Sequence, residues 1–197
     1  MKKVSISGST RENVGKKDAK ELRKIGRVPC VLYGGNEQIH FSVEEKDFKD
    51  IIYTPEVCFV DININDNVYS SIVQEAQFHP VNDNILHVDF LELSKDKAIV
   101  MSIPVKLTGV APGVLKGGKL TKKLRKLKIK AKPEFMPDFV NVDISSLDIG
   151  NSVKVNDISI DNLEFLDSKN NVVVGVYVTR VAVADETTEK TAETKAE

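Results

Sequence analysis

Apolar residues recur at every second position in short runs of this chain, and this spacing constrains the fold more than any other feature. Successive side chains of a β-strand point to opposite faces of a sheet, so a period of two indicates strands with one buried face. The longest run covers residues 99–107, where five apolar side chains alternate with other residues: Ile99, Met101, Ile103, Val105 and Leu107. We therefore expect a mainly β protein with short helices.

Several strands are expected in residues 1–93. Val4 and Ile6 alternate with Lys and Ser, and Val31, Leu32 and Tyr33 precede two glycines. Turn residues at 65–67 separate two β-branched runs, which predicts a hairpin of residues 57–64 and 68–78. A further strand over residues 85–91 would place Leu86, Val88 and Phe90 on one face, and Ile85, His87, Asp89 and Leu91 on the other.

Two short helices are expected between these strands. Ala19, Leu22 and Ile25 recur at a helical spacing among charged residues, and Gly26 follows as a C-terminal cap. Ser42 and Glu45 match the capping-box pattern at the start of a second helix, which Phe48, Ile51 and Ile52 would line. Together with the strands, this predicts a β-barrel-like domain over residues 1–93.

A second β-rich domain is expected over residues 94–184. It opens with the alternating run at 99–107, and glycine and proline then concentrate in residues 109–118, as in loops. Leu120, Leu124 and Leu127 fit a helical stripe, whereas Leu127, Ile129 and Ala131 alternate as in a strand, so this segment is ambiguous. Residues 185–197 lack any apolar period, and we expect a disordered tail.

Charge is strongly segregated along the chain, although the formal net charge is only −1. Residues 1–33 carry 9 Lys and Arg against 3 acidic residues, and residues 94–133 carry 12 against 1. Residues 34–93 and 134–197 are acidic instead. Two basic surfaces are therefore expected, and a polyanion could bind either of them.

Other sequence features argue against several classes of protein. No apolar stretch reaches the length of a spanning helix, and the first residues lack the apolar segment of a secretory signal, so we expect a cytoplasmic protein without membrane contact. Cys30 and Cys58 are too few for a disulfide framework and lie in apolar contexts, where a thiol is usually inert.

Two motifs could carry chemistry, and both are weak. Residues 113–120 place two glycines four positions apart before a lysine, but Leu120 stands where a phosphate-binding loop needs Ser or Thr. His79, His87 and Asp89 could form a metal face, although His79 precedes a proline in what looks like a loop. A metal-dependent enzyme using these three residues therefore stays an alternative, as does a protein-binding β module without RNA affinity.

A more coherent pattern is cationic and polar. Basic residues in and around the first helix can follow a phosphate backbone. Six polar residues can bond base edges or ribose hydroxyls: Tyr33, Gln74, Gln77, His79, His87 and Asp89. RNA fits this pattern better than DNA, because its minor groove is wide and shallow and no DNA-reading helix is evident. The basic residues are Arg11, Lys16, Lys17, Lys20, Arg23, Lys24 and Arg27.

Ordered motifs along residues 3–183 resemble a bacterial family of large-subunit ribosomal proteins that bind 5S rRNA, also called general stress protein Ctc. The motifs of the first half are Gly15-Lys16, Leu22-Arg23-Lys24-x-Gly26, Val28-Pro29-x-Val31-Leu32-Tyr33-Gly34, Gln77-x-His79-Pro80 and Leu86-His87-Val88-Asp89-Phe90. Those of the second half resemble the long form of the family, with Pro104-Val105, Gly109-x-Ala111-x-Gly113-Val114, Gly117-Gly118, Met136-Pro137, Val142-Asp143 and Leu147-x-Ile149-Gly150.

The resemblance implies a barrel of about six strands that docks on 5S rRNA in the large ribosomal subunit, with neighbouring ribosomal proteins as further partners. It implies no catalysis, metal, cofactor or small-molecule substrate. Transferred residue by residue, the RNA-contacting positions of the family fall on Arg11, Lys16, Arg23, Tyr33, Gln77, His87 and Asp89.

Overall fold

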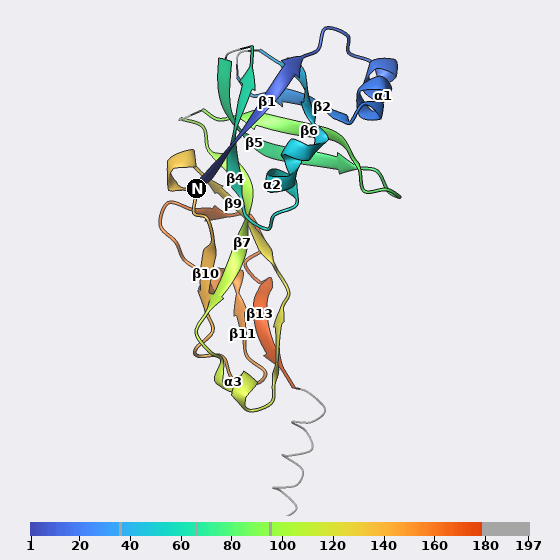
Figure 1. Ribbon diagram of the computed structural model, residues 1–197. Helices are drawn as coiled ribbons and strands as arrows, with labels where there is room; N and C mark the ends of the chain where they lie inside the picture. Colours follow the sequence, from blue (N-terminus) through green and yellow to red (C-terminus); the bar gives the residue numbers. More distant parts are fainter. Residues whose placement is uncertain (36, 66, 95, 179–197) are drawn as a thin grey trace, which may run out of the picture. The chain divides into compact units, whose positions relative to one another are not determined.

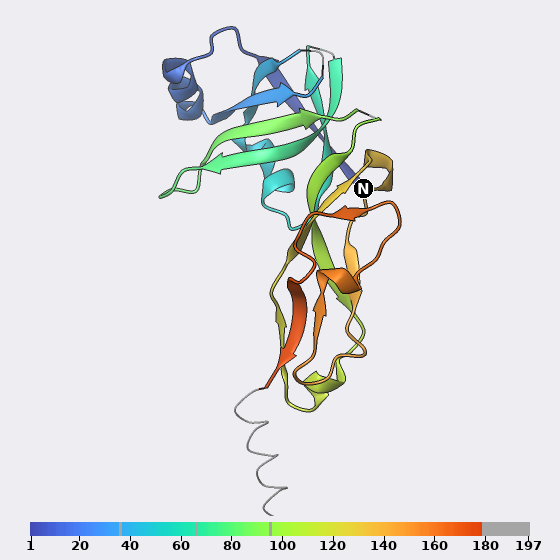
Figure 2. The ribbon, with the colours of Figure 1, turned by 180° about the vertical axis from the view of Figure 1, so that it is seen from behind.

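The structure, a computed structural model, describes residues 1–35, 37–65, 67–94 and 96–178, and most of its regular elements are strands (Figures 1 and 2). Contacts within the chain define two units. The first comprises Met1–Met101 with Lys130–Asp138, and the second comprises Ser102–Ile129 with the described residues from Phe139 on. The predicted boundary at residue 93 stays a prediction, and the predicted tail at 185–197 lies outside the described residues.

Six strands of the first unit form a closed barrel in the order β1-β3-β2-β6-β5-β4. Two parallel pairs, β1 with β4 and β2 with β6, join segments far apart in the sequence, and the remaining neighbours are antiparallel. Closure leaves no strand of this sheet with an unpaired edge. The strands are β1 (Lys2–Thr10), β2 (Arg27–Tyr33), β3 (Ile39–Glu44), β4 (Cys58–Ile64), β5 (Asn67–Phe78) and β6 (Ile85–Glu92).

Alternating side chains fill the barrel. On β4 the buried residues are Cys58, Val60, Ile62 and Ile64, as a period of two requires. Three phenylalanines meet in this core: the ring centroid of Phe90 lies 5.7 Å from that of Phe41 and 6.4 Å from that of Phe48. Phe48 comes from a 3-10 turn, η1 (Glu45–Phe48), which continues into the short helix α2 (Lys49–Ile52). The predicted core positions Phe48 and Ile51 are both buried.

The basic helix predicted after Gly15 is confirmed as α1 (Lys16–Lys24), which lies outside the barrel beside β2 (Figure 1). Its C-cap is Ile25, and Gly26 follows with a φ of 76°, a conformation that costs glycine little. No residue of α1 is buried. The helix therefore depends on a few side-chain contacts for its position.

Two sequence predictions for the barrel are wrong. Ser42 is a residue of β3 rather than a helix cap, because the backbone there pairs with β1 and β2, and η1 begins three residues later without a side-chain cap. On β6, Ile85 is buried and Leu86 only half-buried, opposite to the prediction. The pairing of β5 with β6 is irregular between Gln77 and Phe78, and this irregularity interrupts the simple alternation.

The second unit is also β-rich. One sheet has four strands in the order β10-β7-β9-β12, and the other has three in the order β11-β13-β8. Leu120 lies on β8 and Leu127 on β9, so the helical interpretation of this segment is wrong. The elements that follow the barrel strands are β7 (Ile99–Thr108), α3 (Pro112–Leu115), β8 (Lys119–Lys122), β9 (Lys126–Ala131), η2 (Pro133–Phe135), β10 (Val140–Asp143), β11 (Ser152–Lys154), η3 (Val155–Asp157), β12 (Glu164–Phe165) and β13 (Val172–Tyr177). Of these, η2, the start of β7 and the end of β9 belong to the first unit.

The glycine loop of this unit is not a phosphate-binding loop. The motif at residues 113–120 begins inside α3, and Lys119 starts a strand. A phosphate-binding loop instead follows a strand and opens a helix whose N-terminus faces the phosphate. The glycines serve packing: a Cβ on Gly113 would lie 2.6 Å from the backbone carbon of Asp148.

Candidate nucleic-acid interface

Polar side chains gather on the outer surface of β6 and its neighbours. Val88 and Phe90 are buried, so His87 and Asp89 on the alternate positions of β6 face outward. Gln77 on β5 pairs with His87 in the strand register, and Glu75 pairs with Asp89. The strands thus bring the predicted residues Gln77, His87 and Asp89 together, although Gln77 is 10 and 12 positions from the other two in the sequence.

His87 and Asp89 form a close pair. His87 Nδ1 lies 2.6 Å from Asp89 Oδ1, and the two side chains are 26% and 31% exposed. In the neutral imidazole, donation from Nδ1 leaves Nε2 as a hydrogen-bond acceptor. Asp89 retains its second carboxylate oxygen as a further acceptor. With a neutral His87, the pair therefore offers two acceptors, Nε2 of His87 and the second oxygen of Asp89.

Tyr33 ends β2 on the adjacent strand, where the register pairs it with Leu91 of β6. Its side chain shares the outward direction of Val31, which pairs with Asp89. Partial burial, and then the negative charges of Asp89 and Glu75, raise the pKa of the Tyr33 phenol. Tyr33 therefore stays a neutral group that both donates and accepts hydrogen bonds.

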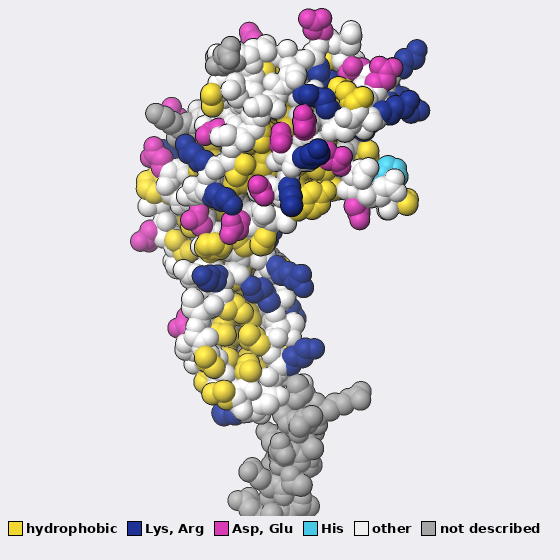
Figure 3. Space-filling view, viewed as in Figure 1, with side chains coloured by type: hydrophobic (Ala, Val, Ile, Leu, Met, Phe, Trp, Pro, Cys, Tyr) yellow, Lys and Arg dark blue, Asp and Glu magenta, His cyan; other side chains and the backbone are white. Residues whose placement is uncertain are grey.

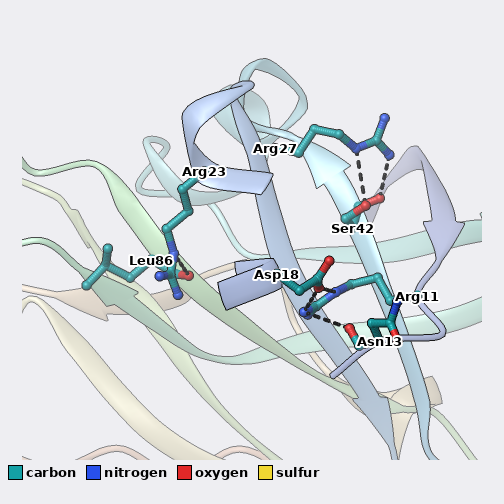
Figure 4. A network of polar contacts seen from close by, with 7 residues as sticks. All are labelled: Arg11, Asn13, Asp18, Arg23, Arg27, Ser42 and Leu86. Carbon is teal, nitrogen blue, oxygen red and sulfur yellow. Dashed lines mark hydrogen bonds and ion pairs between the residues drawn. The ribbon is translucent and has the colours of Figure 1, made fainter. Parts of the chain in front are cut away.

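Tyr33, Gln77, His87 and Asp89 form a polar strip on β2, β5 and β6, and helix α1 adds positive charge beside it. Five of its nine residues are basic and all five are exposed: Lys16, Lys17, Lys20, Arg23 and Lys24. Arg23 Nε donates to the backbone oxygen of Leu86 on β6 at 3.0 Å, which links the helix to the polar strip (Figure 4). Of the residues predicted from the sequence, Lys16 and Arg23 thus lie on the flanking helix.

Arg11 differs from the other predicted residues because it is engaged inside the protein. Its side chain is only 7% exposed, and its guanidinium donates through Nε to Asp18 Oδ2 at 3.0 Å and through Nη2 to the same oxygen (Figure 4). A longer contact of 3.5 Å joins Nη2 to the backbone oxygen of Asn13. Arg11 therefore ties the loop before α1 to the helix, and Asp18 offsets its charge.

Arg27, which the sequence pattern grouped with the phosphate-binding cations, also makes structural contacts. Arg27 Nη2 donates to Ser9 Oγ at 2.7 Å and to the backbone oxygen of Ser42 at 2.9 Å, and Nε donates to Ser42 Oγ at 3.1 Å. These bonds join β1, β2 and β3. Arg23, Arg27 and His79 also line a cavity of about 180 Å³ between α1 and the β5–β6 turn.

The described part of the chain gives little support for metal binding, a membrane-spanning helix or a reactive thiol. His79 Nδ1 accepts from the backbone N–H groups of Val81 and Asn82 at 3.3 and 3.4 Å. No group of three His, Cys, Asp or Glu side chains there is placed to hold a metal ion, and no helix there is long and apolar enough to cross a membrane. Cys30 and Cys58 are buried free thiols, and burial raises the pKa of both.

Sequence reasoning did not single out Glu75 or the acceptor oxygen of Leu86. Glu75 comes opposite Asp89 only because the pairing of β5 shifts between Val73 and Glu75. A local pattern carries no signal for such a shift. The Leu86 oxygen is a backbone atom, and only the position of α1 brings Arg23 to it.

Fold and site together define a class of protein: a closed β-barrel whose polar outer strip is flanked by a basic helix, joined in one chain to a second β-rich unit. The ribosomal L25p family matches residues 6–90, and the C-terminal domain of ribosomal protein TL5 matches residues 98–180. The chain belongs to the L25p family of ribosomal proteins, which are not enzymes. The alternative of a metal-dependent enzyme is therefore wrong.

Relatives match nearly the whole chain. The large ribosomal subunit protein bL25 of Cytophaga hutchinsonii is 49% identical over 180 residues, which are 91% of this chain and 94% of the relative. The proteins of the same name from Azobacteroides pseudotrichonymphae and Phocaeicola vulgatus are both 45% identical, each over 92% of this chain, and over 97% and 96% of their own lengths.

Proposed function

We propose that this protein is a structural component of the large ribosomal subunit, in the bacterial cytoplasm, and binds 5S rRNA through its barrel. Two acceptors fixed by the His87–Asp89 pair, next to Gln77 and Tyr33, support this proposal most directly. A 2′-hydroxyl or a base amino group fits such acceptors, and folded RNA presents both in a wide, shallow groove. Neighbouring ribosomal proteins are further proposed partners.

The proposed RNA-binding residues divide by role. Lys16 and Arg23, which lie on α1, bind phosphates of the RNA. Base edges or ribose hydroxyls are bound by Tyr33, Gln77, His87 and Asp89. Arg11 acts through Asp18 by holding α1 in place. We further propose that residues 1–93 act as the RNA-binding domain and 94–184 as a separate β-rich domain.

Binding should depend on salt. If four or five basic side chains engage phosphates, the logarithm of the affinity should fall against the logarithm of salt concentration with a slope of about −3 to −4.5. A gel shift or fluorescence titration of the full chain with 5S rRNA, at several salt concentrations, measures this slope. A flat response would favour the alternative of a protein-binding β module without RNA affinity.

Asp89→Asn tests the specific part of the interface. The substitution removes the charged partner of His87, so affinity for 5S rRNA should fall by about fivefold, as for one lost hydrogen bond. Binding to an unrelated RNA duplex of equal length should not fall, because no phosphate contact is removed.

Glu75→Gln is the matched control for this experiment. It neutralises a carboxylate that lies opposite Asp89 in the register and leaves the His87–Asp89 pair in place. Its affinity for 5S rRNA should be unchanged or slightly higher. Equal losses of Asp89→Asn on both RNAs, or equal losses by both variants on 5S rRNA, would rule out the role given to the pair.

A further inference from the structure

Basic residues are concentrated in the second unit, and the function proposed for the barrel does not involve them. Ser102–Ile129 contain 8 Lys and Arg and no Asp or Glu. On the face of this unit seen in Figure 3, dark blue side chains lie beside yellow ones, and magenta is scarce. Six of the basic residues, named the basic cluster below, come from β7, β8, β9 and the β8–β9 connection: Lys106, Lys122, Lys123, Arg125, Lys126 and Lys128.

Hydrogen bonds around Val105 bring three members of the basic cluster, Lys106, Lys122 and Arg125, close together. The backbone N–H of Val105 donates to the oxygen of Arg125 at 3.0 Å, and Lys122 Nζ donates to the oxygen of Val105 at 2.6 Å. Lys106 is the next residue of β7 and faces outward, since Val105 is buried. Lys126 and Lys128 share the outer face of the same sheet, because Leu127 and Ile129 between and after them are buried.

Two exposed aromatic rings adjoin the basic cluster. Lys106 Nζ lies 5.5 Å from the ring centroid of Phe139, and Lys123 Nζ lies 5.4 Å from that of Tyr177. Phe139 and Tyr177 are 40% and 39% exposed. Each cation–π contact holds an ammonium group beside an aromatic ring that is still partly open to solvent.

Acidic groups flank the basic cluster without neutralising it. Asp143 on β10 pairs in register with Thr108, and its Oδ1 already accepts from the N–H and hydroxyl of Ser145. Asp167 Oδ2 accepts from the backbone N–H of Lys128 at 2.7 Å, and Glu164 lies on β12, which neighbours β9. Among the described residues, three carboxylates thus flank the six cations of the basic cluster, which leaves an excess of positive charge.

We propose that the basic cluster, with Phe139 and Tyr177, is a second RNA-binding surface, specific for an unpaired RNA segment. Ammonium and guanidinium groups contact phosphates, and exposed rings stack on bases that only an unpaired strand makes available. Residues i and i+2 of a strand lie about 6.6 Å apart, so Lys126 and Lys128 are spaced much like successive phosphates. An RNA duplex would use the cations but leave the two rings without a base to stack on, because its bases are stacked on one another.

The test uses the full chain and a labelled single-stranded RNA of about 16 nucleotides, which matches the largest site of a single OB-fold domain on such a strand. All proteins also carry Lys16→Gln, Lys20→Gln and Lys24→Gln, which weaken any contribution of α1. The outcome is then independent of the function proposed for the barrel. Circular dichroism of each variant checks that it is folded.

Lys123→Gln with Arg125→Gln removes two exposed cations of the basic cluster. The logarithmic salt slope for the single strand should become shallower by about 1.4, since each phosphate contact on a single strand contributes about 0.7. Lys154→Gln with Lys169→Gln removes the same charge from exposed positions elsewhere in the unit. This control pair should leave the slope nearly unchanged, and an equal effect of both pairs would overturn the proposal.

Substitutions of Tyr177 test the stacking contact. Tyr177→Leu should weaken single-strand binding by about fivefold or more, whereas Tyr177→Phe keeps the ring and should retain binding. A duplex of equal charge should bind more weakly than the single strand. Unchanged binding by Tyr177→Leu, equal binding of the duplex, or preferential binding of poly-glutamate would each overturn the proposal, and the last would indicate an acidic protein as partner.

Discussion

Asp18→Asn should loosen α1 from the barrel by about 1 to 2 kcal/mol. Asp18 is the partner of Arg11, whose side chain is 7% exposed, and the pair joins the helix to the loop before it. The substitution leaves the Arg11 guanidinium largely buried with only a long contact to the Asn13 oxygen. The substitution therefore removes the ion pair that connects α1 to the preceding loop and leaves the Arg11 guanidinium with too few hydrogen-bond acceptors.

The magnitude follows from the exposure of the two partners. A hydrogen bond to a charged group contributes about 1.5 to 3 kcal/mol, and solvent reduces this figure because Asp18 is 34% exposed. Little else holds the helix: α1 has nine residues, too few for stability alone, and none of them is buried. The population in which α1 has opened should thus rise by about 5- to 30-fold.

Amide hydrogen exchange of α1 measures this opening directly. The N–H groups of Ala19 and Ile25, which donate to Gly15 and Glu21, should exchange faster in Asp18→Asn, while those of the barrel strands should not change. Glu21→Gln is the control, because it neutralises an exposed acid of the same helix that has no side-chain hydrogen bond or ion pair with the described residues. Unchanged exchange in Asp18→Asn, or equal acceleration in Glu21→Gln, would refute this role of the ion pair.

Three more predictions concern stability and reactivity. Phe90→Ala should destabilise the barrel by about 3 to 5 kcal/mol in urea denaturation, because it empties a fully buried site between two other rings, and a loss below about 1 kcal/mol would contradict the described core. Both thiols should react slowly with a disulfide reagent at pH 8 in the folded protein and quickly in guanidinium, since burial raises the pKa of Cys30 and Cys58; fast labelling of the folded protein would contradict their burial. Hydrogen bonds from Ser145 lower the pKa of Asp143. The carboxylate therefore stabilises the fold above the ordinary carboxylate pKa, and this stabilisation is lost as the pH falls through the lowered pKa. Asp143→Asn should make acid unfolding less steep, and an unchanged pH profile of stability would exclude this role.

Elements with a local signal could be predicted from the sequence. The hairpin of β4 and β5 forms where β-branched runs flank Asn65, whose φ of 49° suits a turn. Helix α1 ends before Gly26 as the spacing of Ala19 and Leu22 indicates. Such features depend on a few neighbouring residues, so the chain itself contains the necessary information.

Features that depend on distant pairing could not be predicted in this way. Ser42 and Glu45 satisfy the capping-box pattern, yet Ser42 pairs with Pro29 and Ser9 of other strands. Leu120 and Leu127 fit a helix, but β8 pairs with β13 and β9 joins the four-stranded sheet. Tertiary pairing overrides local preference in both cases.

The candidate site shows the same division. Alternation along β6 predicted that His87 and Asp89 share a face, and they do. The burial of Arg11 against Asp18 was not predictable, because the two residues are seven positions apart with a loop between them. The residue pattern and the family resemblance suggest the roles of these residues, whereas only the folded structure shows their contacts.

The two parallel pairs of the barrel have a consequence for synthesis of the chain. β1 pairs with β4, and β2 pairs with β6. The parallel pairing of β1 therefore forms only after residues 58–64 have been synthesised, and that of β2 only after residues 85–92. Such long-range pairings are slow to form because a large loop must close first. On a translating ribosome, the emerging amino-terminal strands should stay open to chaperones until about ninety residues have left the exit tunnel.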